Sequence, residues 1–85
     1  PEFAIAYFNL GNSQFAMNHF GEAQKSYERS VEMGLDFLSM HWKLYEIHLE
    51  KKEYKKAEKE LKIILEMDPL NDDAKKKLFS LPSTH

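Results

Sequence analysis

The chain has 85 residues, enough for one small domain with a thin core, because a chain of this size buries only about 60–65% of its unfolded surface. It has no cysteine, which excludes disulfide bridges and thiolate metal sites and weakly favours the cytosol as its compartment. The net charge is −2, and no apolar run approaches the roughly 20 residues of a membrane span. We therefore expect neither nucleic-acid binding nor membrane insertion.

The two ends of the chain are expected to lie outside the folded region. Residues 1–3, Pro-Glu-Phe, resemble the scar of a common expression vector, and residues 82–85 are expected to form a disordered tail. The helical pattern begins at full strength at Ala4, so we expect the chain to be a piece of a longer protein.

Between the ends, apolar side chains recur at helical spacing, which predicts an all-α chain. A first helix ends at the break over residues 18–21, and a second spans about residues 21–33. Gly34 suits a left-handed helix C-cap. A third helix is predicted over about 36–50 and a fourth over about 54–67, where the Asp-Pro pair at 68–69 stops it. Asn71 is the predicted N-cap of a shorter fifth helix.

The spacing also predicts which side chains face inward. In the second, third and fourth helices the inward residues are Ala23, Tyr27, Ser30, Val31, Met40, Leu44, Ile47, Ala57, Leu61, Ile64 and Leu65. The fifth helix is expected to cover the end of the helical array, with Leu78, Phe79 and Leu81 facing the other helices and the lysines at 75–77 facing water.

Similar residues recur 34 positions apart along the chain. The pairs are Leu10 and Leu44, Phe20 and Tyr54, Ala23 and Ala57, Tyr27 and Leu61, and Met33 and Met67. A fixed period with two helices per period is typical of repeats that stack on one another, since a single helix pair cannot bury its apolar face alone.

In residues 4–79 the chain resembles the tetratricopeptide repeat family. The stretch "YFNLGNSQF" is close to the family's pattern, and "EMDPLND" resembles its turn between repeats. The resemblance implies antiparallel helix hairpins stacked as a right-handed α-solenoid, with repeats at residues 4–37 and 38–71 and a capping helix at 72–81. Tyr45 and His48 depart from the small residue and Tyr usual at their positions. Ser30 and Ile64 replace a usual Ala, so the helices are expected to approach less closely there.

The histidines and serines of the chain favour neither a metal site nor a catalytic one. His41 and His48 share a helix face, and a metal site would need a third ligand such as His19, so we favour a packing role for both histidines. No serine, histidine and acid follow the spacing of a hydrolase, so no enzyme activity is expected.

The segment "KKEYKKAEKELK" looks basic. Because Glu53, Glu58 and Glu60 alternate with its lysines, we interpret it as a solvated face.

The family resemblance implies that the first helix of each pair lines a concave groove. The predicted groove residues are Ile5, Phe8, Asn9, Asn12, Phe15, Ser39, Trp42, Lys43, Glu46, Leu49, Lys76 and Lys77. The resemblance further implies a scaffold or adaptor that binds a peptide or helix of another protein and needs no cofactor. Some relatives clamp the acidic tail of a chaperone, but Phe8 and Asp73 do not fit that clamp. Structural self-association through an exposed stacking face, as a dimer or larger assembly, is the alternative.

Overall fold

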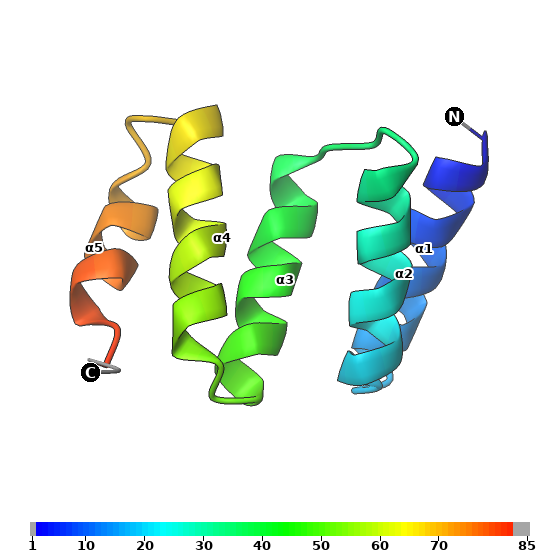
Figure 1. The fold of residues 1–85 in the computed structure, drawn as a ribbon, viewed down its shortest axis with the longest axis horizontal. Coiled ribbons are helices and arrows are strands. Elements are labelled where there is room, and N and C mark those ends of the chain that lie inside the picture. Colours follow the sequence, from blue (N-terminus) through cyan, green and yellow to red (C-terminus); the bar gives the residue numbers. More distant parts are fainter. Residues whose placement is uncertain (1, 83–85) are drawn as a thin grey trace. The chain divides into compact units, whose positions relative to one another are not determined.

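The computed structural model describes residues 2–82, which form five α-helices and no strand (Figure 1). The helices are α1 (Glu2–Ala16), α2 (Phe20–Glu32), α3 (Leu38–Glu50), α4 (Tyr54–Met67) and α5 (Asp72–Ser80). The all-α helical-repeat prediction is confirmed. Helix α1 already includes Glu2 and Phe3, two of the residues interpreted as a vector scar. Of the expected tail, residues 83–85 lie outside the described residues.

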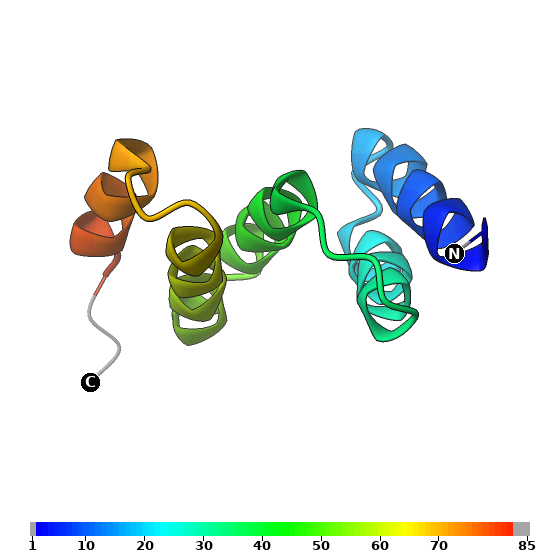
Figure 2. The same cartoon turned by 90° about the horizontal axis from the view of Figure 1, so that it is seen from above.

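The described chain divides into two compact units, with the boundary between Met40 and His41. The first unit holds the antiparallel hairpin of α1 and α2. The second unit holds most of α3 together with α4 and α5, each antiparallel to the helix before it (Figure 1). Within this second unit, α4 lies between α3 and α5 and is displaced to one side of them (Figure 2). The repeat boundaries and the handedness of stacking stay predictions.

Three turns between helices share one backbone geometry, in which a left-handed residue follows the helix. These residues are Asn18 (φ 62°), Gly34 (φ 100°) and Lys52 (φ 60°). In each turn the next N–H bonds back to a carbonyl of the last helical turn: His19 to Gln14 (2.8 Å), Leu35 to Ser30 (3.1 Å) and Glu53 to His48 (2.8 Å). These bonds satisfy carbonyls that the helix end leaves without partners. The predicted role of Gly34 is confirmed, and Asn18 and Lys52 are equivalent positions of the 34-residue period.

The core of the first unit forms where α1 and α2 cross. Ala23, Tyr27 and Ser30 are fully buried on α2, as their spacing predicted. The Ser30 hydroxyl donates a 2.6 Å hydrogen bond to the Ala4 carbonyl on α1, so the serine links the two helices where we expected a looser approach. Val31 was predicted to face inward, but it is 37% exposed because it lies one residue beyond the buried stripe.

The core of the second unit follows the predicted helix faces. Leu44 and Ile47 are buried on α3, and Ala57, Leu61 and Ile64 are fully buried on α4. Met40, the last residue of the first unit, is also fully buried as predicted. Leu65, expected inside, is only half-buried.

Helix α5 is capped as predicted but packs through a different residue. The Asn71 side chain accepts a 2.9 Å hydrogen bond from the Ala74 N–H, which fixes the start of the helix. Ala74 is fully buried, whereas Phe79 is 91% exposed, so the prediction that Phe79 faces the array is wrong. The reason is helical geometry: Ala74, Leu78 and Leu81 share one face, and Phe79 lies about 100° away from Leu78.

Candidate functional site

The predicted groove residues of α3 lie on one helix face that stays at least partly exposed. Ser39 and Glu46 are exposed, and Trp42, Lys43 and Leu49 are half-buried. This face is opposite the buried residues of α3 because its members recur at intervals of three, four and seven. The sequence therefore placed these side chains on the surface of the hairpin and not in its core.

Trp42 is held in place by an aromatic neighbour on its own helix. Its ring meets the Tyr45 ring edge to face, with centroids 5.8 Å apart and planes at 88°. Tyr45 is buried, and this burial raises the pKa of its hydroxyl above the ordinary value of 10.0. A fixed Tyr45 therefore supports a Trp42 ring whose other parts remain accessible.

The predicted residues of α5 lie on the same unit, near Tyr45. Lys77 Nζ and Asp73 Oδ1 form a 3.3 Å ion pair, and both charges act on the Tyr45 hydroxyl. Lys76, the residue before Lys77 in α5, is exposed. We call this surface of the second unit the α3–α5 face; it consists of Trp42, Lys43, Glu46, Leu49, Lys76 and Lys77. Ser39 lies before the unit boundary and is not included.

On α1, the predicted groove residues divide into exposed ones and ones that hold the first unit together. Ile5 and Asn9 are exposed. The Phe8 ring meets the Phe37 ring edge to face at 5.2 Å, and the Phe15 ring meets that of Phe20 at 5.3 Å. The Asn12 side-chain oxygen accepts a 2.6 Å hydrogen bond from the Tyr27 hydroxyl. Three of the five residues on α1 thus have structural partners that helical spacing alone did not reveal.

The two histidines of α3 are packing residues, as expected. His41 Nδ1 lies 2.7 Å from Glu60 Oε1, and His48 Nδ1 lies 2.9 Å from Glu53 Oε1. Both histidines are buried, so these bonds join α3 to α4 and to the turn before it. The hydrogen bond from His48 lowers the pKa of Glu53 below its ordinary value of 4.5.

Two kinds of site find no support among residues 2–82. This part of the chain contains no cluster of three or more histidine, cysteine, aspartate or glutamate residues that could hold a metal ion. None of its helices has both the length and the apolar character needed to cross a membrane.

Comparison with known proteins supports the fold and its repeat character. Residues 4–34 match the family model of the tetratricopeptide repeat. A search of curated proteins found no match. The matched segment covers most of α1, all of α2 and the Gly34 turn. Tetratricopeptide repeats are a non-catalytic class that generally mediates protein–protein interaction and scaffolding. The match and the all-helical architecture support a tetratricopeptide repeat in residues 4–34, within a chain built of helix hairpins.

Proposed function

We propose that this chain is a non-enzymatic scaffold or adaptor module whose α3–α5 face binds a peptide or helix of another protein. The observation that carries the proposal is the position of Trp42, a half-buried ring supported by the buried Tyr45 and set among accessible polar side chains. Partly exposed aromatic side chains held on rigid helices are the residues that most often anchor protein partners.

The arrangement of this face indicates what kind of segment it would bind. Trp42 and Leu49 are seven residues apart on α3, which separates their apolar side chains by about 10 Å along the helix. Glu46 lies between them, and the Lys77–Asp73 ion pair borders the face from α5. A partner segment with two apolar side chains at that separation, and polar groups between them, would match these features.

An acidic chaperone tail would fit this face less well. Asp73 is exposed beside Lys77 and carries the same charge as a tail carboxylate. Two like charges at close range repel each other, and Asp73 already partly neutralises the charge of Lys77. We therefore propose that the partner is anchored by apolar side chains and not by a terminal carboxylate.

Trp42 is the single tryptophan of the chain, so its fluorescence reports directly on the proposed surface. Peptides selected from a random display library against the full chain would be titrated into it. A saturable blue shift of the tryptophan emission is expected, because a bound apolar side chain removes water from the indole. Selected peptides that bind without changing this emission would place the binding surface elsewhere and contradict the proposal.

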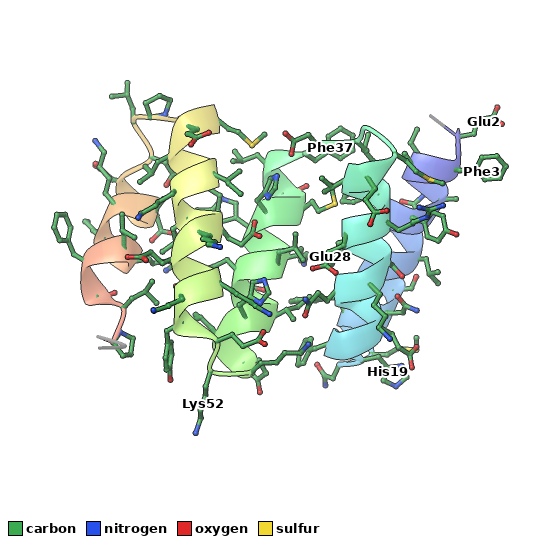
Figure 3. All side chains as sticks on the ribbon, in the orientation of Figure 1. Glu2, Phe3, His19, Glu28, Phe37 and Lys52 are labelled. Carbon is green, nitrogen blue, oxygen red and sulfur yellow. The ribbon has the colours of Figure 1, made fainter. Side chains whose placement is uncertain are left out.

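The second candidate function is self-association through α1, which an exposed apolar stripe favours. Phe3, Leu10 and Met17 recur every seven residues and are 72%, 46% and 58% exposed, and Phe3 projects away from the start of α1 (Figure 3). Leu44 occupies the same position of the repeat as Leu10 but is only 4% exposed. A second copy that covered this stripe would give Leu10 the burial that Leu44 has.

Sedimentation equilibrium tests self-association directly. If a dimer or larger assembly forms through α1, the apparent mass will rise with concentration, and Leu10→Glu will return it to the monomer value. Leu70→Glu, a change at an exposed leucine in the turn before α5, is the control and should leave the assembly intact. A monomer at every concentration would remove this candidate.

A further inference from the structure

The segment around α4 is more strongly basic on its surface than its sequence suggests. In the sequence, Glu53, Glu58 and Glu60 alternate with lysines, which indicated a solvated face of mixed charge. In the structure, however, Glu60 bonds to the buried His41 and Glu53 bonds to the buried His48. Two of the three carboxylates are therefore directed toward α3, and only Glu58 remains fully exposed among them.

The lysines of α4 lie together on one side of the helix, which they share with the exposed Glu66, one turn beyond Lys62. Lys55, Lys59 and Lys62 are exposed and recur at intervals of four and three, with Lys56 adjacent to them. Lys56 pairs with Glu53 at 3.5 Å, while Lys55, Lys59 and Lys62 form no ion pair within residues 2–82. We call these four residues the α4 lysine face. Its three unpaired charges extend over about 10 Å of helix.

The stability of α4 does not explain this charge pattern. A helix favours acidic side chains in its first turn and basic ones in its last, because of its dipole. Helices α2 and α5 follow this rule. Their first turns contain Glu22 and Asp72, and their last turns contain Arg29 and Lys77, respectively. Helix α4 does the reverse, with Lys55 and Lys56 in its first turn and no acid there, and no basic residue in its last turn. The positions of its lysines thus oppose the local electrostatic preference.

We propose that the α4 lysine face is a second binding surface, distinct from the α3–α5 face, that docks an acidic segment of a protein partner. Several like charges that repel one another are stabilised when carboxylates approach them. The partner segment would carry acidic side chains spaced over about 10 Å, matching Lys55, Lys59 and Lys62. This inference does not depend on how the α3–α5 face is used.

The composition of the face favours an acidic protein segment over a nucleic acid. Base stacking requires exposed aromatic rings, and planar recognition of phosphate favours arginine, but the α4 lysine face contains neither. The exposed Glu58 at its edge and the net charge of −2 would also repel a long polyanion. A peptide with interspersed charges can place a basic side chain near Glu58.

The test measures binding of a fluorescently labelled oligoglutamate peptide to the full chain by anisotropy, at low and at physiological ionic strength. The variant K55E/K59E reverses two charges of the α4 lysine face. The matched control K25E/K75E makes the same change in net charge on α2 and α5, at two other exposed lysines. Circular dichroism checks that each variant is folded, and K55Q/K59Q serves if the charge reversal disturbs the helix.

We expect K55E/K59E to weaken oligoglutamate binding by at least about tenfold and K25E/K75E to change it by less than about twofold. Wild-type affinity should fall with added salt, because exposed charges are screened. Trp42→Ala should bind the peptide like the wild type, which separates this proposal from the α3–α5 face. The proposal would be overturned if both reversal variants lost binding equally, or if the wild type did not bind the peptide at low salt. Tighter binding of an oligothymidylate or of anionic vesicles than of the peptide would also overturn it.

Discussion

The ring of Tyr27 lies directly against the backbone of Gly11, where α2 crosses α1. A Cβ at Gly11 would lie 2.7 Å from Tyr27 Cε1 and 2.8 Å from Cδ1, closer than such atoms can approach without a shift. The ring is fully buried, and its hydroxyl is bonded to Asn12, so it cannot easily move aside. The close packing of the first hairpin therefore depends on the missing side chain at position 11.

Gly11→Ala is predicted to destabilise the protein by about 1–2 kcal/mol. Overpacking against a fixed ring costs about 1–3 kcal/mol, and the better helix propensity of alanine returns up to about 1 kcal/mol. Urea unfolding followed by circular dichroism measures the difference. Gly21→Ala is the matched control, because a Cβ at Gly21 meets no atom within 4 Å. It should be neutral or slightly stabilising, and a Gly11→Ala variant as stable as the wild type would contradict the description of this crossing.

Lys52→Gly is predicted to stabilise the protein by about 0.5–1 kcal/mol. Lys52 has a φ of 60°, and a left-handed conformation costs a residue with a Cβ about 1–2 kcal/mol, whereas glycine loses about 0.5–1 kcal/mol in backbone entropy. The Lys52 side chain projects away from the turn, so few contacts are lost (Figure 3).

The same substitution at a helical position provides the control for Lys52. Lys59→Gly, inside α4 and also exposed, should destabilise by about 1 kcal/mol because glycine is a poor helix former. Thermal unfolding of both variants measures the two changes, which should have opposite signs. A loss of stability in Lys52→Gly would show that the turn does not strain this residue.

Glu53→Gln is predicted to make stability less sensitive to acid. The pKa of Glu53 is lowered in the folded state by its hydrogen bond to His48, so the folded protein binds this proton less readily than the unfolded chain. The resulting stabilisation is present above the ordinary value of 4.5 and is lost as the pH falls through the lowered folded-state pKa. Urea midpoints above and below this range should therefore differ less in Glu53→Gln than in the wild type.

Glu58→Gln serves as the control for this pH effect. Glu58 is exposed on α4 and forms no ion pair within the described part of the chain. Its substitution should leave the wild-type difference between the two pH values nearly unchanged. If Glu53→Gln and Glu58→Gln behave alike, the His48–Glu53 bond does not contribute to acid stability.

Periodicity predicted the helices and most of the core, and it was most informative where a buried position satisfies two independent rules. Ala23 and Ala57 lie 34 residues apart and also fall on the inward stripe of their helices, and both are fully buried. Leu44 and Ile47 are also buried, but helical spacing alone predicted this, because Leu10, the repeat partner of Leu44, is 46% exposed. Agreement between helical spacing and repeat spacing leaves little freedom in the packing of such residues.

The sequence was less informative where a side chain has a choice of partner. Glu60 could have paired with a lysine on its own helix, but it bonds to His41 because the buried imidazole needs a polar partner. Phe79 was expected to face the helical array, but it lies one residue after Leu78, off the inward face of α5, and is exposed to water. Such choices depend on which element lies opposite, and spacing along one helix does not contain that information.

The same limit applies to the candidate surface. Its α3 residues could be predicted because they occupy the helix face opposite the buried residues. The ring contact of Trp42 with Tyr45 could not be predicted, because the family resemblance implies a small residue at position 45. On α1, Phe8 and Phe15 were expected to face a ligand. Their rings instead pack against Phe37 and Phe20, which belong to neighbouring segments.

The affinity of the full chain for a display-selected peptide, compared with that of Trp42→Ala, tests the central claim most directly. A buried aromatic anchor contributes about 2 kcal/mol or more to binding, so Trp42→Ala should lower the affinity for the peptide at least about tenfold. Unchanged helicity and melting would show that the indole acts in binding and not in folding. Lys25→Ala, at an exposed residue of α2, should leave the affinity unchanged. A folded Trp42→Ala variant that binds the peptide as tightly as the wild type would contradict the account.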